Sequence, residues 1–478
     1  QLLLEPCALW VGVQRLRGLG VHTESFDTMQ PDGHSFRVLT YNILARSLGS
    51  NTIPWVLNVS PQTRARIEDK TGEAFGAWRK TNVDEEYKRH WHKNFHSGDY
   101  AAMRALWGCR VLRSDGDIPE KLSGLKFESE DKVLYVKGGL PTVATTLRGV
   151  LRRSLGEAEG LRLFAEVSEK DATIYDWAAR GPRVFDVCTT ADIVALCEYD
   201  IHSVHASYKN GDQPFHAAMA SQGYDGAFFT DPLIGRTPPA GLGVFWRSDV
   251  FELVEEQSDR IIACNTTTVS LSNHDLLEKW HPLVVPPTDG GGVTAMDLPA
   301  ADRRQAAVVR LRHKASGRVV CVVAVHLMTT SRDGPGVTRF PGEVRAGELA
   351  TIKNIVAERA ARDDAVVLLG DFNTPPSETH VWSGDVGFKH ATGWGGDGAF
   401  SWGQRTLRDA FAPVHGWADC EGVCTSKNGD RSLWIDYIFH DASLAPMERS
   451  DVSAPAGAIP DLVHPSDHLP LACTFRFS

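Results

Sequence analysis

The chain has 478 residues, enough for about three average domains, although large sandwich folds also reach this length. Its hydrophobic content of 42% and charged content of 23% are those of an ordinary globular protein, and no apolar run approaches the roughly 20 residues that a membrane span requires. The formal net charge of -10 argues against a broadly basic surface that holds nucleic acid by phosphate neutralisation alone. A phosphate ligand would therefore need a metal ion or a local basic patch.

Residues 1–34 are expected to form an N-terminal extension. Its first part, QLLLEPCALWVGVQRLRGLG, is mildly amphipathic and carries Arg15 and Arg17, which fits either the remnant of a transit segment or an ordinary packed piece. The nine cysteines of the chain show neither zinc-like spacing nor a paired framework, and their number is odd. We therefore expect reduced thiols and an intracellular location, with cytoplasm or organelle left open.

Six segments combine an apolar run, which predicts a buried strand, with polar side chains at the end or centre of that run. In chain order, with their polar residues, they are SFRVLTYNILA with Asn42, TTADIVALCEYD with Glu198, RVVCVVAVHLMTT with His326, DDAVVLLGDFNTPPSE with Asp371 and Asn373, SLWIDYIFHD with Asp436, and HPSDHLPLACTFRF with Asp467 and His468. One such residue is usually a turn or cap residue. Six in one chain indicate a shared site.

The side-chain types in these segments indicate the chemistry. Four are carboxylates, two are amides and two are imidazoles, and an oxygen-rich set of this kind suits Mg²⁺ or Mn²⁺. Burying several carboxylates together without a cation costs several kcal/mol per charge, and a divalent metal ion resolves that conflict. Such an ion can neutralise a phosphoryl oxygen and orient a water molecule, which makes phosphoester hydrolysis the natural reaction.

The order of the motifs YNILA, CEYD, HL, GDFNTPPS, IDYIF and SDHLPL resembles the signature series of the endonuclease/exonuclease/phosphatase superfamily, whose fold is of the DNase I type. Within it, the motifs are most similar to the branch of the deadenylases, nocturnin, the angel proteins and the 2',5'-phosphodiesterase. The resemblance implies an α/β fold, a four-layer α/β sandwich of two mixed β-sheets flanked by helices. The pattern agrees, since residues 306–327 predict a β-hairpin and residues 343–364 a helix.

The resemblance also implies roles for the eight residues. Glu198 would be the principal metal ligand, with Asn42 beside it and Asp467 completing the metal side. Asp371 would activate or position the attacking water. Asn373 and His326 would hold the phosphate, and Asp436 would orient His468. A histidine with an aspartate partner has a fixed tautomer and a stabilised cation, which suits contact with a phosphorane-like transition state.

The chain departs from the usual family pattern at positions next to these residues. Cys197 stands where a glutamine usually precedes the ligand glutamate, and Tyr199 stands where a small aliphatic residue is common. Ala324 and Val325 replace the Asn and Thr that commonly precede the histidine, and Glu348 replaces a Gln of the following helix. We expect these changes to alter substrate contacts and to leave the chemical core intact.

The catalytic domain is expected to span residues 35–478 and to contain a large, mostly helical insertion at about residues 46–176. Residues 140–167 predict one or two amphipathic helices in it. Its basic runs YKRHWHK and LRGVLRR could form a local positive patch. His90, His92 and His96 match no specific zinc motif, so packed or solvated helix residues are favoured. A second irregular segment, residues 265–302, predicts a loop.

Three functions fit the sequence. The first is a magnesium-dependent phosphodiesterase acting on RNA, as a 3' exonuclease or deadenylase-like enzyme. The second is a phosphatase of a small phosphorylated nucleotide or metabolite, which the acidic net charge favours. The third is a catalytically silent scaffold with the same fold, which the clustered carboxylates argue against because they destabilise a metal-free fold. We expect the insertion to restrict what enters the site, or else to dock a protein partner.

Overall fold

The computed structural model describes the chain in a series of segments separated by gaps. These are residues 34–44, 61–84, 126–129, 131–137, 140–145, 147–175, 177–199, 215–229, 241–254, 262–264, 305–327, 352, 356–376, 399–402, 405–415, 422–428, 431–457 and 459–478. The N-terminal residues up to 33, the three histidines His90, His92 and His96, and the loop predicted at 265–302 lie outside them.

One mixed sheet has six strands in the order β18-β19-β1-β5-β7-β6. Their bounds are β1 Ser35–Asn42, β5 Ile193–Tyr199, β6 Tyr224–Phe229, β7 Gly241–Arg247, β18 Leu444–Arg449 and β19 Leu471–Phe477. β1 and β5 run parallel, and the other neighbours are antiparallel. The strands predicted to carry Asn42 and Glu198 are therefore side by side, with their carboxyl ends at the same edge.

The second mixed sheet has eight strands, in the order β13-β14-β17-β12-β11-β10-β8, with β9 also paired to β10. Their bounds are β8 Phe251–Leu253, β9 Ile262–Cys264, β10 Gln305–His313, β11 Val319–His326, β12 Ala365–Asp371, β13 Ala399–Trp402, β14 Arg405–Asp409 and β17 Asp436–His440. β11 and β12 are parallel, and β10 and β11 form the predicted antiparallel hairpin. The sequence predicted that Asp436 lies inside an apolar strand. This was wrong, because Asp436 is the first residue of β17.

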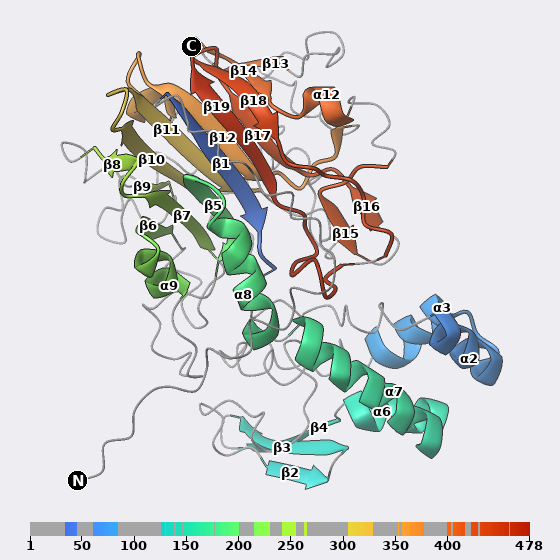
Figure 1. Ribbon diagram of the computed structural model, residues 1–478. Coiled ribbons are helices and arrows are strands. Elements are labelled where there is room, and N and C mark those ends of the chain that lie inside the picture. Colours follow the sequence, from blue (N-terminus) through green and yellow to red (C-terminus); the bar gives the residue numbers. More distant parts are fainter. Residues whose placement is uncertain are drawn as a thin grey trace, which may run out of the picture.

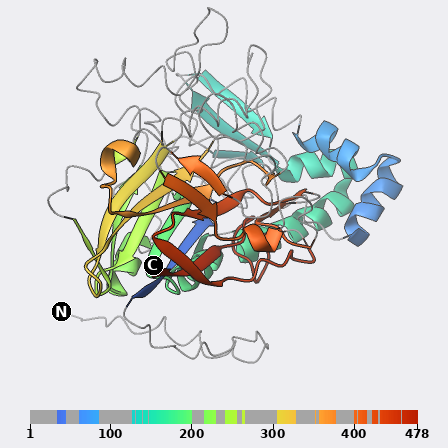
Figure 2. The ribbon, with the colours of Figure 1, turned by 90° about the horizontal axis from the view of Figure 1, so that it is seen from above.

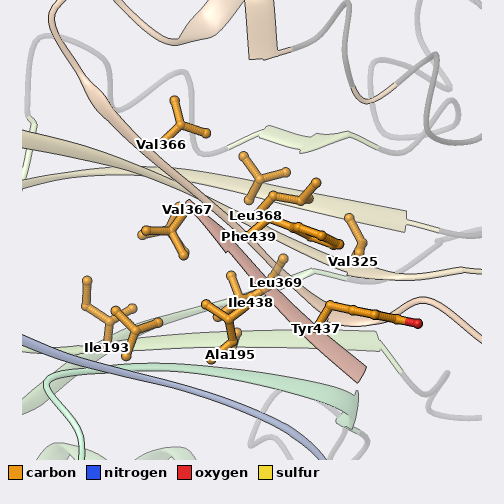
Figure 3. Packing of buried hydrophobic residues seen from close by; sticks show 14 of the residues in the cluster. Ile193, Ala195, Val325, Val366, Val367, Leu368, Leu369, Tyr437, Ile438 and Phe439 are labelled. Carbon is orange, nitrogen blue, oxygen red and sulfur yellow. The ribbon is translucent and has the colours of Figure 1, made fainter. Parts of the chain in front are cut away.

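The two sheets face each other across the main hydrophobic core (Figure 3). Ile193 and Ala195 of β5 project into it from one sheet, while Val367 and Leu369 of β12 and Ile438 of β17 project from the other. The intervening Val194 and Leu196 belong to a second core on the outer face of the six-stranded sheet. This alternation follows from the two-residue period of a strand and makes β5 buried on both faces.

Helices form the outer layers, as the predicted four-layer sandwich requires. α8, Trp177–Cys188, and α9, Phe215–Ser221, pack on the outer face of the six-stranded sheet. In the helix predicted at 343–364, Ile352 and residues 356–359 are helical, and both Ile352 and Val356 join the main core. Among the helices that the structure describes, none combines the length and the apolar character needed to cross a membrane.

The insertion has a small hydrophobic core of its own, which includes Ile67, Trp78, Leu163 and Tyr175. Its described elements are α2 Pro61–Thr71, α3 Phe75–Arg79, π-helical η2 Lys80–Asp84, β2 Lys126–Ser129, β3 Lys132–Lys137, β4 Leu140–Thr145, α6 Leu147–Leu155, α7 Glu157–Lys170 and π-helical η6 Asp171–Tyr175. They lie beside the sandwich rather than between its sheets (Figures 1 and 2).

The mostly helical prediction for the insertion was wrong in one part. β2, β3 and β4 form an antiparallel three-stranded sheet, and residues 140–145, which were predicted to begin a helix, are the strand β4. The sequence LPTVAT of β4 is rich in β-branched and small residues and has a proline near its start, so it suits an edge strand better than a helix. The helical periodicity begins only at Leu147.

A β-hairpin and a short helix complete the described elements near the C-terminus. The hairpin consists of β15 Ser426–Asn428 and β16 Arg431–Leu433, and the helix is α12, Ala412–His415. Cysteines at five described positions are free and buried: Cys188, Cys197, Cys321, Cys424 and Cys473.

Candidate active site

Strand register places three of the predicted site residues in one row. His326, the last residue of β11, is paired with Asp371, the last residue of β12, and Asp371 is paired in turn with Asp436, the first residue of antiparallel β17. Adjacent strands are about 4.8 Å apart, so side chains in such a row meet if they project from the same face. The register therefore brings together three groups that lie up to 110 positions apart in the sequence, from 326 to 436.

Asp371 is the centre of the hydrogen-bond network and is buried. Its Oδ1 accepts a bond of 2.8 Å from the backbone N–H of Asn373, and its Oδ2 accepts one of 3.0 Å from Nδ2 of Asn42, which ends β1 in the other sheet. Nε2 of His326 lies 3.5 Å from the same Oδ2. The carboxylate of Asp371 is thus held by groups from two other strands, β1 and β11, and by the turn that follows its own strand.

The turn around Asp371 depends on two unusual backbone conformations. Asn373 has φ +49°, a left-handed conformation that asparagine tolerates, and its Nδ2 donates to the carbonyl oxygen of Leu327 at 2.8 Å. Gly370 has φ +141°, and a Cβ at this position would lie 1.9 Å from the carbonyl oxygen of Val325. Only glycine lets β12 approach β11 closely enough here.

A β-bulge directs Glu198 to the site. Cys197 pairs with Leu242 and Tyr199 pairs with Gly241, so Glu198 is the extra residue of β5, and it has φ +58°. The Cys197 side chain faces the main core and the Tyr199 side chain faces the outer core, so regular alternation is interrupted between them. A bulge of this kind re-aims one side chain. Oε1 of Glu198 lies 3.4 Å from Nδ2 of Asn42.

His468 and Asp436 form a buried pair next to Asp371. Nδ1 of His468 lies 2.7 Å from Oδ2 of Asp436, and Nε2 lies 3.8 Å from Oδ2 of Asp371. Burial by itself lowers the pKa of His468, but the charges of Asp436, Asp371 and Asp467 raise it to about 10. His468 is therefore a cation near neutral pH, and its Nδ1–H donates a hydrogen bond to Asp436, which fixes the orientation of the ring.

The carboxyl group of Asp371 titrates in a different range from an exposed aspartate. Burial, followed by the nearby Asp436 carboxylate, raises the pKa of Asp371 to about 7, although His468 and the hydrogen bonds from Asn42 and Asn373 act in the opposite direction. A carboxyl group that titrates near neutral pH can accept a proton from water, which is the property of a general base. The pair Asp371 and His468 thus combines a base with a neighbouring cation.

Two residues that the sequence analysis did not single out hold the site together. The Ser466 hydroxyl donates to the carbonyl oxygen of Asn42 at 2.6 Å and accepts the backbone N–H of His468 at 3.2 Å. The Thr425 hydroxyl oxygen accepts the N–H of Asp436 at 3.0 Å, while the Thr425 carbonyl accepts the N–H of Leu469 at 2.7 Å. Ser466 lies inside the SDHLPL motif, which was the available signal, whereas nothing local in the sequence marks Thr425.

The residues predicted to bind a metal ion lie next to Asp371 or His468, in space or in the chain. Asn42 joins Glu198 to Asp371, and Asp467 precedes His468 in the chain. The compact group of possible ligands among the described residues is a different set, Asp371, Asp436 and His468, for which the sequence analysis expected catalytic roles, and its ligand atoms lie within 4.8 Å of one another. Oδ1 of Asp436 is buried and has no hydrogen-bond partner among the described residues. These clustered oxygen atoms fit a hard divalent cation such as Mg²⁺ or Mn²⁺.

Exposure distinguishes the open side of the site from its floor. Glu198, His326 and Asn373 are half-buried, whereas the other five predicted residues are buried. The structure therefore brings the eight predicted residues to one region at the edge where both sheets end, and the three half-buried ones are its most exposed members. The arrowhead of β1 in Figure 1 points to this edge, towards α8.

Comparison with known proteins identifies the family of the chain. The model of the endonuclease/exonuclease/phosphatase family matches residues 155–468, which include all of the predicted site residues except Asn42. No curated protein matches the chain.

Several solved structures are similar to the chain at low sequence identity. The human nocturnin catalytic domain has a TM-score of 0.40 and 20% identity, over 63% of this chain and 87% of that one. The structure of ANGEL2, described as a 2',3'-cyclic phosphatase, has a TM-score of 0.43 and 17% identity, over 65% of this chain and 92% of that one. A mannosyl-6-phosphatase from Bacteroides thetaiotaomicron has a TM-score of 0.39 and 14% identity, over 63% and 92% respectively.

Proposed function

Because this chain belongs to the endonuclease/exonuclease/phosphatase family, a family of phosphoester hydrolases, we propose that it is a magnesium- or manganese-dependent phosphodiesterase that hydrolyses RNA from a 3' end. The observation that carries the proposal is the placement of Asp371, fixed by Asn42 and Asn373 beside the Asp436–His468 pair. A base can accept the proton of the attacking water, while a neighbouring cation stabilises the negative charge that develops on the oxygens of the phosphoryl group.

The residues have four roles in this proposal. Asp371 positions the attacking water and accepts its proton, which the raised pKa of its carboxyl group favours. His468, oriented by Asp436, places positive charge against the oxygens that gain negative charge in the transition state. Asn373 and His326, which are half-buried, would hold the phosphate. Glu198, Asn42 and Asp467 would hold the divalent ion, which when bound would neutralise phosphoryl charge.

A phosphatase of a small phosphorylated nucleotide or metabolite is the second candidate. The observation that favours it is the net charge of -10, because a long nucleic acid gains most of its affinity from basic surface. A silent scaffold is disfavoured by the geometry, since a fold without chemistry has no need of a buried carboxylate with a pKa of about 7 next to two others.

A substrate panel separates the candidates. Purified protein is incubated with Mg²⁺ or Mn²⁺ and with labelled oligo(A), mixed-sequence RNA, single-stranded DNA, phosphorylated nucleotides and an activated phosphodiester. The RNA proposal expects shortening of RNA from its 3' end, abolished by EDTA and by Glu198→Gln. Release of inorganic phosphate from the nucleotides without RNA shortening supports the second candidate. If no substrate is turned over above the level of the Glu198→Gln protein, the scaffold reading replaces both.

We also propose that the insertion lies beside the mouth of the site and restricts the substrates that enter. The chain enters the insertion shortly after Asn42 and returns through α8 before β5, so both of its connections are near the site. The alternative is that the insertion docks a protein partner and faces away from the substrate.

A further inference from the structure

Arg180, on the first turn of α8, is completely buried and bonds four backbone carbonyl groups. Its Nε donates to Tyr175 at 3.1 Å, its Nη1 donates to Ile43 at 2.5 Å and to Pro465 at 3.2 Å, and its Nη2 donates to Leu44. A guanidinium group carries five N–H donors in a rigid fork, so it can bond several segments at once. A buried cation is tolerated only when such bonds replace its hydration.

Two of the bonded segments carry the site. Ile43 and Leu44 directly follow Asn42 at the end of β1, and Pro465 directly precedes Ser466, Asp467 and His468. The same two segments are also joined by the Ser466 hydroxyl, which donates to the Asn42 carbonyl oxygen at 2.6 Å. Arg180 and Ser466 thus both join the segment after Asn42 to the segment before His468. We call this contact between the two segments the junction, and it sets where Asn42 lies relative to His468.

The third bonded segment belongs to the insertion. Tyr175 ends η6 and is part of the separate core of the insertion. The Trp177 ring, which belongs to the core between α8 and the six-stranded sheet, lies 5.0 Å from the guanidinium carbon of Arg180. α8 itself runs from the insertion to the sandwich (Figure 1). Arg180 therefore stands where the insertion, the sandwich and the site loops meet.

We propose that Arg180 is a positioning residue that fixes the loop after Asn42 against the loop before His468 and so couples the insertion to the catalytic geometry. The inference rests on the proposed phosphoester hydrolysis, in which Asn42, Asp371 and His468 act together. It predicts that disturbing Arg180 misplaces the site without contact to the substrate. A displacement of about 1 Å in a site of this kind can lower a rate by about a hundredfold.

Arg180→Lys is the main test. A lysine keeps the charge but has a single ammonium group in place of the fork, so it cannot bond the Tyr175, Leu44 and Pro465 carbonyls together. We expect kcat for an activated phosphodiester to fall by about tenfold to a hundredfold with KM changed by less than about threefold. Mn²⁺ binding, measured by calorimetry, should weaken by about tenfold, because groups behind metal ligands commonly have effects of this size.

Arg183→Lys is the matched control. Arg183 lies three residues further along the same helix, and its Nη1 bonds the carbonyl of Asp461 at 2.7 Å. It makes no described bond to the segments that follow Asn42 or directly precede His468, so we expect kcat and Mn²⁺ affinity within about twofold of the wild type. The double variant Arg180→Lys/Ser466→Ala should lose less activity than the product of the two single losses, because both changes release the same junction.

Trp177→Phe keeps the proposal testable if Arg180→Lys does not fold. It reduces the aromatic surface against the guanidinium and should reproduce the kcat and Mn²⁺ effects at smaller size. Hydrogen exchange in residues 463–468 should speed up in both variants. A folded Arg180→Lys or Trp177→Phe protein with wild-type kcat, Mn²⁺ affinity and exchange, and only a lower Tm, would overturn the proposal. If the wild type itself hydrolyses nothing, the proposed function fails, and Mn²⁺ binding and exchange still decide whether Arg180 positions the site.

Discussion

Asn42 and Asp371 end strands of different sheets, lie 329 positions apart in the chain, and are joined by a hydrogen bond of 3.0 Å between Nδ2 of Asn42 and Oδ2 of Asp371. This bond links the two sheets at the edge that carries the site, because β1 belongs to the six-stranded sheet and β12 to the eight-stranded one. It also brings Glu198, which lies 3.4 Å from the same amide, to the carboxylate that we propose as the base. The function proposed for the site depends on this meeting of two sheets.

Removing either carboxylate charge should abolish most turnover. We expect Glu198→Gln and Asp371→Asn each to lower kcat by about a hundredfold or more, equivalent to about 3 kcal/mol of transition-state stabilisation, because a metal ligand or a water-positioning group is lost. Asp363→Asn is the control, since Asp363 is exposed and precedes the other end of β12. Steady-state kinetics with the activated phosphodiester make the comparison. Activity within twofold of the wild type in either site variant would contradict the role proposed for that residue.

His468→Ala should lower kcat much more than it raises KM. The imidazolium held by Asp436 at 2.7 Å is expected to interact mainly with charge that develops in the transition state, and such an interaction contributes little to ground-state binding. His464→Ala provides a control in the same loop, because His464 is half-buried and pairs with Asp461. If His468→Ala changes only KM, the residue binds substrate instead of stabilising the transition state.

Gly370→Ala should destabilise the protein more than an ordinary substitution at a positive-φ glycine. The added Cβ would lie 1.9 Å from the Val325 carbonyl oxygen, so the β11–β12 pairing beside Asp371 must shift. We expect a loss of about 3 kcal/mol or more in the free energy of unfolding, measured by urea denaturation. Gly317 has φ +69°, and an added Cβ would meet no neighbouring atom. Gly317→Ala therefore measures the backbone strain alone and should lower the free energy of unfolding by about 1–2 kcal/mol. Equal losses in the two variants would contradict the steric argument.

The buried His440 should make the folded protein less stable in mild acid. Burial lowers the pKa of His440, whose Nδ1 lies 2.9 Å from the Asp441 carbonyl oxygen and is therefore protonated in the neutral ring. When the pH falls through about 6.5, the unfolded chain binds a proton that the folded His440 resists, so the free energy of unfolding decreases. In His440→Asn, which keeps a donor without titrating, the decrease between pH 7.5 and 5.5 should be smaller. An identical pH slope in urea denaturation of both proteins would exclude this contribution.

Shortening the insertion tests its role as a gate. Replacing residues 46–174 by a Gly/Ser linker leaves Tyr175, Trp177 and Arg180 in place and should preserve hydrolysis of the activated phosphodiester. If the insertion selects substrates, the ranking of RNA, DNA and nucleotides by kcat/KM should change, because side chains beside the mouth are removed while the chemistry stays. An unchanged ranking with unchanged KM values would point to a protein partner instead.

The sequence by itself determined where the strands lie and which polar residues end them. An apolar run followed by Asp371 and Asn373, or by Asn42, is a local pattern, because burial of a strand and the switch to a polar turn both act within a few residues. The hairpin of β10 and β11 was predictable for the same reason. The prediction that the helical stretch at 140–167 begins at residue 140 was wrong, because residues 140–145 are a strand; a short run of small and β-branched residues fits a strand equally well until its partners are known.

Only the tertiary structure decided how these residues meet. The row of His326, Asp371 and Asp436 follows from strand register, and the direction of Glu198 follows from a bulge that is defined by the pairing of β5 with β7. Arg180 is the clearest case, because it donates its described hydrogen bonds to backbone carbonyls, which every residue possesses and which leave no mark in the sequence. Side-chain types specify the chemistry locally, whereas contacts between distant backbone groups exist only once the sheets have packed together.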